Sequence, residues 1–271
     1  MNIVVGIEDR GLDLSTLIIN RTPYAARYGC ILAAHPISKK LVNVEIKGCE
    51  MSLAAETGIL CTVLADIIVE NLQIRYLLRS LKQNNLLLTE KDMCDVLVSV
   101  LKKMWFGASG KGKDIEACKS DVKKRLIECL EENEADTIVL EGFMRFRMAD
   151  YLRIWENELQ ANVRRYLRKK EYAEFVEILR LFISIRIPRE KTIHLCVDGR
   201  GDYFLLNEKM FMLHPGKNRP IDKDDALLSE LVNLAPYHII VHNKERFEDD
   251  RMLETIKDVF GKRVEFSDTM I

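Results

Sequence analysis

The chain has 271 residues, enough for one large domain or two smaller ones. Hydrophobic residues make up 48% and charged residues 31%, and Gly and Pro are few, which excludes a disordered, collagen-like or low-complexity chain. The 41 Lys and Arg nearly cancel the 42 Asp and Glu, so the net charge of −1 excludes a uniformly basic protein that coats nucleic acid or anionic membranes.

The sequence predicts a cytoplasmic protein. The first residues include Glu8 and Asp9 and no basic leader, so no signal peptide is expected. The most apolar stretch, residues 58–72, contains Asp66 and Glu70, and no transmembrane segment is predicted. The seven cysteines are odd in number and scattered, which indicates reduced thiols.

Residues 1–50 read as a small β-containing region. Three runs of β-branched or apolar residues, at 3–7, 30–34 and 41–47, are separated by Gly and Pro. From residue 51 the apolar residues recur every three or four positions, which predicts a long amphipathic helix over residues 52–83. The period therefore changes from strand to helix near residue 50.

A helical domain is predicted over residues 51–189. Thr89 is a candidate N-cap for a second helix, and residues 114–133 form a third. Residues 137–140 are apolar and read as a short strand or a buried extended link. Residues 143–187 read as one or two helices, with a break expected near 169–171, and Pro188 ends them.

Residues 190–271 predict a compact α/β module. Two alternating runs, at 192–197 and 203–206, flank an Asp-Gly-Arg-Gly turn and predict a β-hairpin. A helix ending near Leu234, a strand at 237–242, a further helix stopped by Gly261 and a strand at 263–266 follow. The last strand–helix–strand succession predicts a parallel pair. The predicted fold class is therefore α+β and mainly α.

No motif in the sequence predicts a catalytic residue, a metal ligand or a cofactor. The loop 107–113 resembles a phosphate-binding loop, but Asp114 replaces the hydroxyl residue and the loop follows a predicted helix where the motif requires a strand, which favours a helix connector. On a strand, His238 and His242 lie about 13 Å apart, too far for a shared metal. An enzyme without a recognisable motif stays an alternative.

Charge is segregated along the chain. Residues 143–191 carry twelve cations against seven anions, a net charge of +5, whereas residues 222–271 have a net charge of −5. This predicts a site for nucleic acid or another phosphate ligand on a basic face, and its candidate residues are Arg145, Arg147, Arg164, Arg165, Arg168 and Lys169. The alternative is a solvated helix end, because cations stabilise the last turn of a helix.

Two segments carry a family resemblance. Residues 64–72 with Arg79-Ser-Leu-Lys82, and Glu141-Gly-Phe-Met-Arg-Phe-Arg-Met148, resemble the YtxC-like sporulation proteins of endospore-forming bacteria. The resemblance extends over about residues 60–270, and it implies a process and a host type without a known activity or site. Arg145 and Arg147, which we expect to open the helix containing Trp155, oppose its dipole there and so need a carboxylate partner or a ligand.

The sequence thus favours a cytoplasmic, non-enzymatic, sporulation-associated protein that acts through contacts with an unknown protein partner. The first alternative is phosphate or nucleic-acid binding through the basic face of the helical domain, and the second is an enzyme with no recognisable motif.

Overall fold

The computed structural model of the chain describes residues 2–9, 11–47, 52–85, 88–107, 113–133, 136–213, 223–247 and 250–267. Its contacts divide the chain into an N-terminal unit, Met1–Tyr166, and a C-terminal unit, Leu167–Ile271. The fold is α+β and mainly α, as the sequence predicts. The division into regions 1–50, 51–189 and 190–271 stays a prediction.

The N-terminal unit combines a four-stranded sheet with helices. The sheet has the order β2-β3-β1-β4 and is built from β1 (Asn2–Gly6), β2 (Ile31–Pro36), β3 (Leu41–Lys47) and β4 (Thr137–Val139). Strand β1 pairs antiparallel with β3 and parallel with β4. The first three residues of the short apolar run at 137–140 therefore form a strand that pairs with the first strand of the chain, and Leu140 begins the next helix. Two helices that the sequence did not predict are α1 (Leu14–Ile19) and α2 (Thr22–Ala26).

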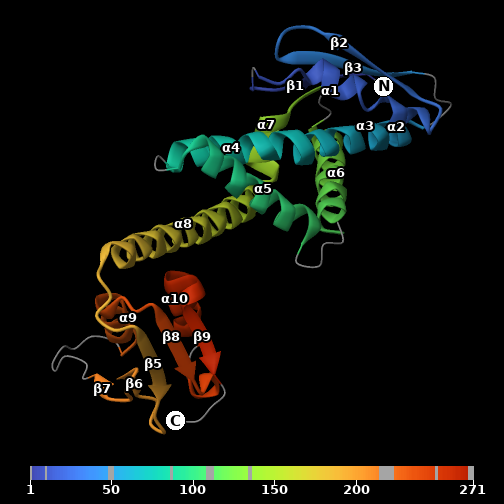
Figure 1. Cartoon of the computed structure of the whole chain (residues 1–271). Coiled ribbons are helices and arrows are strands. Elements are labelled where there is room, and N and C mark those ends of the chain that lie inside the picture. The colour runs from blue at the N-terminus through green and yellow to red at the C-terminus, as the bar shows by residue number, and fades with distance from the viewer. Residues whose placement is uncertain are drawn as a thin grey trace. The chain divides into compact units, whose positions relative to one another are not determined.

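The predicted long helix is present, with an irregular turn inside it. Helix α3 (Leu53–Ile67) continues through the π-helical turn η1 (Ile68–Leu72) into α4 (Gln73–Asn84), and Figure 1 shows them as one rod beside the sheet. Arg21 and Lys119 both bind the Glu70 carboxylate of η1, at 3.0 and 2.6 Å. These two contacts hold the π-helical turn from both neighbouring segments.

Two more helices confirm the sequence prediction. Helix α5 (Glu90–Phe106) begins at Thr89, whose hydroxyl accepts from the Asp92 N–H while the Asp92 carboxylate accepts from the Thr89 N–H, a capping box. Helix α6 (Lys113–Asn133) packs along α3. The loop compared with a phosphate-binding loop lies mostly outside the described residues.

The helices after β4 differ from the prediction in where they break. Helix α7 (Leu140–Arg147) ends at Met148, and α8 (Ala149–Ile185) then runs without the break expected near 169–171. Arg125 explains the break at Met148, because its guanidinium donates to the Arg147 carbonyl at 2.8 Å and pairs with Asp150 in the first turn of α8.

Arg145 and Arg147 consequently lie in the last turn of α7, not at the start of the helix that contains Trp155. Cations are favourable at a helix C-terminus, so the expected conflict with the helix dipole does not arise. The change of apolar pattern that led to the expected break has another cause. The buried residues of α8 change from one face, with Trp155 and Leu159, to another, with Val176 and Ile183, in an unbroken helix.

The C-terminal unit is a mixed sheet with helices, as predicted. The sheet order is β7-β6-β5-β8-β9, from β5 (Thr192–Val197), β6 (Tyr203–Asn207), β7 (Met212–Leu213), β8 (His238–His242) and β9 (Val264–Ser267). The β5–β6 pair is the predicted hairpin, and β5–β8 and β8–β9 are parallel. Between strands lie α9 (Lys223–Leu234), η2 (Lys244–Arg246), α10 (Asp250–Phe260) and η3 (Gly261–Arg263). The core of this unit includes Val176 and Ile183 of α8.

Candidate functional site

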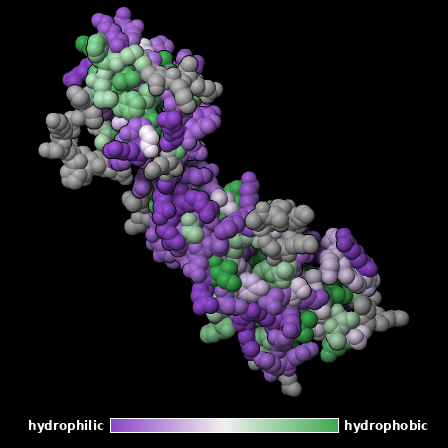
Figure 2. Space-filling model, turned by 90° about the horizontal axis from the view of Figure 1, so that it is seen from below, coloured by the Kyte–Doolittle hydropathy of each residue, from purple (hydrophilic) through white to green (hydrophobic). Residues whose placement is uncertain are grey.

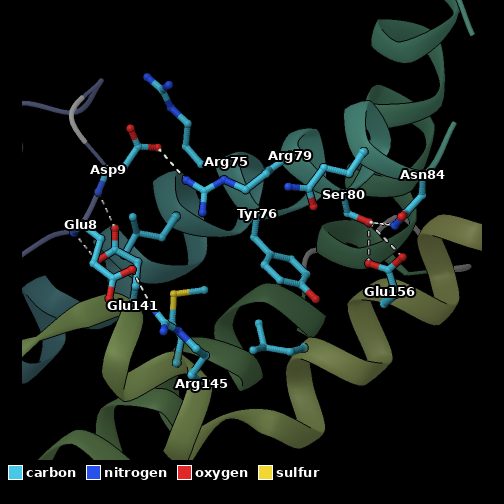
Figure 3. A pocket seen from close by; sticks show the side chains of 14 residues that line it. Glu8, Asp9, Arg75, Tyr76, Arg79, Ser80, Asn84, Glu141, Arg145 and Glu156 are labelled. Carbon is cyan, nitrogen blue, oxygen red and sulfur yellow. Dashed lines mark hydrogen bonds and ion pairs between the residues drawn. The ribbon is translucent and has the colours of Figure 1, made fainter. Parts of the chain in front are cut away.

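A pocket of about 510 Å³ lies in the N-terminal unit where α4, α7 and the start of α8 meet the segment after β1. Figure 3 shows its polar side chains. We call it the arginine pocket, and its lining residues are Glu8, Asp9, Leu72, Arg75, Tyr76, Arg79, Ser80, Gln83, Asn84, Glu141, Met144, Arg145, Leu152 and Glu156. Three arginines and four carboxylates give this lining a formal net charge of −1.

Helix α4 supplies one whole wall of the arginine pocket. Its lining residues include Tyr76, Ser80 and Asn84, which lie four residues apart and continue from Leu72 of η1, with Arg75 and Arg79 beside them. Residues at this spacing lie on one face of a helix. The polar face of an amphipathic helix, which faces water in most proteins, here faces the pocket.

The carboxylate of Glu141 fixes the segment after β1 against α7. It accepts the backbone N–H groups of Glu8 and Asp9, at 2.9 and 3.0 Å. One helical turn further along α7, Arg145 pairs with the Glu8 carboxylate at 2.5 Å. Two residues of the family-like segment 141–148, Glu141 and Arg145, thus hold this wall in place, and Glu8 is the carboxylate partner of Arg145.

Arg75 and Arg79 are held more loosely. Arg75 donates to the Gly11 carbonyl at 2.9 Å, and a Cβ on Gly11 would lie only 3.0 Å from the Arg75 guanidinium, so glycine permits this approach. The closest nitrogen of Arg79 is 3.7 Å from the Asp9 carboxylate, and the Arg79 side chain is 59% exposed. Because a guanidinium carries five N–H donors, these contacts leave most of the donor capacity of both arginines for a ligand.

The other end of the pocket presents acceptors. The Ser80 hydroxyl lies 2.9 and 2.7 Å from the two oxygens of Glu156, and Asn84 donates to the Ser80 oxygen at 3.2 Å. Tyr76 lies between this group and the arginines (Figure 3). Burial, and then the charge of Glu156, raise the pKa of Tyr76, which keeps its hydroxyl protonated.

The six cations that the sequence singled out have different surroundings. Arg145 lines the arginine pocket, and Arg147 pairs with Glu132 at 2.7 Å on the surface. The other four form the basic segment of α8, which we define as Arg164, Arg165, Arg168 and Lys169, all exposed. Arg165 also donates to Asn162 at 3.3 Å. Whether these cations bind a ligand stays a prediction.

Sequence reasoning missed most of the residues of the arginine pocket. Arg75, Arg79 and Glu156 occupy polar positions of amphipathic helices, where charged residues are ordinary. One signal was present, because Arg79-Ser80 and Glu141-to-Arg145 belong to the two segments that carry the family resemblance. These segments are about sixty residues apart in the sequence and line the same pocket.

The histidines of the C-terminal unit lie in an arrangement that the sequence did not predict. His238 and His242 are on strand β8, as expected, but His242 contacts His194 of the neighbouring strand β5, with Nε2 and Nδ1 2.9 Å apart. Burial, and then His242, lower the pKa of His194. In the part of the chain that the structure describes, no three His, Cys, Asp or Glu side chains gather as a metal site would require.

The sequence also predicted reduced thiols and no transmembrane segment. Cys61, Cys94, Cys118, Cys129 and Cys196 are free thiols, as predicted, but the prediction is wrong for Cys30, which is disulfide-bonded. Among the helices that the structure describes, none combines the length and the apolar character needed to cross a membrane.

Comparison with known proteins identifies the family. The model of the YtxC-like family matches residues 59–265. "Uncharacterized protein YtxC" of Bacillus subtilis (strain 168) is 28% identical over 147 residues, which is 51% of this chain, and the chain spans about half the length of this curated relative, 50%. No solved structure matches the chain. The family match covers α3 to β9, and with it most of the arginine pocket and the sheet of the C-terminal unit, so the chain belongs to the YtxC-like family.

Proposed function

We propose that this chain is a binding protein whose N-terminal unit takes up a small molecule with an acid group in the arginine pocket. The observation that carries the proposal is the pair Arg75 and Arg79, one helical turn apart on α4, with most of their donors directed to no partner among the described residues. Guanidinium groups are suited to carboxylate and phosphate, which they bind with two parallel hydrogen bonds.

A binding role fits the pocket better than a catalytic role. The carboxylates of Glu8, Asp9 and Glu141 already contact arginine or backbone N–H groups that hold the pocket wall together. A general acid or base must reach the substrate proton, whereas these three carboxylates already bind groups that hold the pocket wall together.

The process that we propose is sporulation, which the YtxC-like resemblance implies. A cytoplasmic location is part of the proposal and is supported by the free thiols, while the disulfide at Cys30 is a bond that a reducing compartment would open. Ligand binding and a role in sporulation are tested separately, because binding is measured on the purified chain and the role in sporulation is measured in sporulating cells.

Isothermal titration with straight-chain acids from butanoate to octanoate, and with inorganic phosphate, tests the binding proposal. We expect at least one acid to bind, and Arg75→Gln with Arg79→Gln to weaken its affinity about tenfold or more. The matched control is Arg168→Gln with Lys169→Gln, which removes two exposed cations of α8. No binding of any probe, or an equal loss in the control variant, would overturn the proposal.

A second candidate function, contact with another protein, is favoured by the apolar stripe of α8. The stripe consists of Phe175, Ile178, Phe182 and Ile185, all exposed in the C-terminal unit, with Ile185 71% exposed. The face seen in Figure 2 is largely hydrophilic, and its hydrophobic side chains gather in separate groups of different size. Apolar residues at 3-4-3 spacing lie on one face of a helix, as they do in the seam of two paired helices, and a second copy of this chain is the partner that we propose.

Light scattering across a concentration series tests this contact. We expect a dimer, and Phe182→Glu should produce the monomer, because it places a charge in the seam. Ser184→Glu, which adds the same charge to an exposed position of the same helix outside the stripe, should leave the dimer intact. A monomer at every concentration contradicts the contact.

The basic segment of α8, with Arg145 and Arg147, remains our proposal for binding of nucleic acid or another phosphate ligand. The exposure of Arg164, Arg165, Arg168 and Lys169 supports it. Arg145 pairs with Glu8 and Arg147 with Glu132, and these ion pairs argue against a part for the two arginines in binding the anion.

A further inference from the structure

One end of the arginine pocket offers hydrogen-bond donors and the other end offers acceptors. This difference determines which kind of molecule fits both ends. At one end, Arg75 and Arg79 are pure donors. At the other end, the carboxylate of Glu156 is a pure acceptor, and Ser80 and Asn84 lie beside it. Figure 3 shows the Glu156 group on one side of Tyr76 and the group around Arg79, Asp9 and Glu141 on the other.

Each end carries one charged group without an ion-pair partner among the described contacts, and the two charges are of opposite sign. Arg79 has Asp9 near it and Arg145 pairs with Glu8. Arg75 contacts a carbonyl oxygen, and Glu156 contacts a hydroxyl and the side-chain amide of Gln160. Among the described contacts of the lining, Arg75 therefore presents a positive charge and Glu156 a negative charge without an ion-pair partner. A carboxylate has about four acceptor positions, so Glu156 keeps capacity for another donor.

The middle of the pocket is apolar. Leu72, Met144 and Leu152 line it together with the ring of Tyr76. A ligand that reaches both ends must place its hydrocarbon or aromatic part here, where burial of apolar surface contributes about 25 cal/mol per Å². The formal net charge of −1 over the whole lining disfavours a ligand with several negative charges.

We propose that the ligand is bipolar: its acid group binds Arg75 and Arg79, its apolar body lies beside Tyr76, and a cationic or hydrogen-bond-donating group, best an amine, binds Glu156. This inference rests on the proposed function and adds the second recognition point. A zwitterion satisfies both ends and leaves the net charge of the site unchanged.

Titration with paired probes tests the inference. Each straight-chain acid from butanoate to octanoate is compared with the acid of the same length that carries a terminal amine, for example hexanoate with 6-aminohexanoate. We expect that, at the length that spans the pocket, the amino acid binds about tenfold more tightly than the plain acid. In Glu156→Gln this gain should disappear, while the affinity for the plain acid stays.

Two controls keep the result interpretable. Gln at position 156 still accepts from the Ser80 hydroxyl, so the fold should persist, and circular dichroism checks it. Glu132→Gln removes a carboxylate on the surface, outside the lining of the arginine pocket, and should keep the gain.

The outcomes separate the two proposals. If plain acids bind and no amine adds affinity at any length, the bipolar ligand is wrong and the proposed function stands. If the amine adds affinity that Glu156→Gln does not remove, the second recognition point lies elsewhere and the inference is overturned. If neither set of probes binds, the proposed function fails and the inference fails with it.

Discussion

In the arginine pocket, cations come from two separate helices and face carboxylates, whereas in the basic segment of α8 they follow one another along a single helix. Arg75 and Arg145 belong to α4 and α7, seventy residues apart in the sequence, and line the same cavity. Arg164 and Arg168 are one helical turn apart and exposed. The density of charge in a sequence therefore says little about a site, because a site needs cations that converge from different elements.

The largest effect on stability should come from Glu141, whose carboxylate holds the segment after β1 against α7. Glu141→Ala removes the acceptor of two backbone N–H groups, and we expect a loss of about 2 kcal/mol in the free energy of unfolding, because hydrogen bonds to a charged group are the stronger ones. Urea unfolding followed by tryptophan fluorescence measures it, since Trp105 and Trp155 both lie in the N-terminal unit.

The matched variant is Glu132→Ala, which deletes the carboxylate of an exposed ion pair with Arg147. Exposed pairs contribute little to stability, so this change should leave the unfolding curve nearly unchanged. Equal losses in the free energy of unfolding would show that the hydrogen bonds to Glu141 stabilise the chain no more than an exposed ion pair does.

A smaller effect should distinguish the two groups of cations by their response to a polyanion. On a heparin column, replacing the four residues of the basic segment by Gln should move elution to lower salt, because each phosphate-like contact adds to the salt dependence. Arg75→Gln with Arg79→Gln should change elution less, since these side chains face a pocket that a polymer does not fill. The reverse order would break the comparison.

The smallest effect concerns pH and extends the comparison to the C-terminal unit. The pKa of His194 is lowered in the folded state by burial and by His242, so the unfolded chain takes up the proton first as the pH falls below about 6.5. The C-terminal unit should therefore lose stability as the pH falls below about 6.5.

Hydrogen exchange, corrected for its intrinsic pH dependence, measures this effect in peptides that contain β5 and β8. Peptides from β1 and β3 should show no comparable change over the same interval, and His194→Gln should flatten the response of β5 and β8. An unchanged response in that variant would place the titrating group elsewhere.

Sequence reasoning predicted the fold well where the hydrophobic period was long and clear. The rod of α3 and α4, the capping box at Thr89 and the β5–β6 hairpin follow directly from local signals. The break at Met148 could not be predicted locally, because it depends on Arg125, a residue of another helix. The break expected near 169–171 arose from a change in which face of α8 is buried, and periodicity alone does not separate that from an end of the helix.

The candidate site was predicted only at Arg145. Its other residues occupy helix positions that are usually solvent-exposed, and only the tertiary arrangement turns them toward a common space. The return of β4 beside β1 is what brings α7, and with it Glu141, to the segment after β1. No local pattern encodes that pairing.

The π-helical turn η1 determines which face of α4 lines the arginine pocket. A π-helical turn holds one residue more than an α-helical turn, and each residue of an α-helix rotates the chain by about 100°. Because this turn takes up the extra residue, Arg75, Tyr76 and Arg79 keep the face that they would have in a regular helix with one residue fewer. If Ile68–Leu72 closed as a regular α-helix with every residue kept, these side chains would turn by about 100° about the helix axis relative to α3. The composition of both helices would be unchanged, yet the wall that faces Glu141 and Glu156 would consist of different side chains.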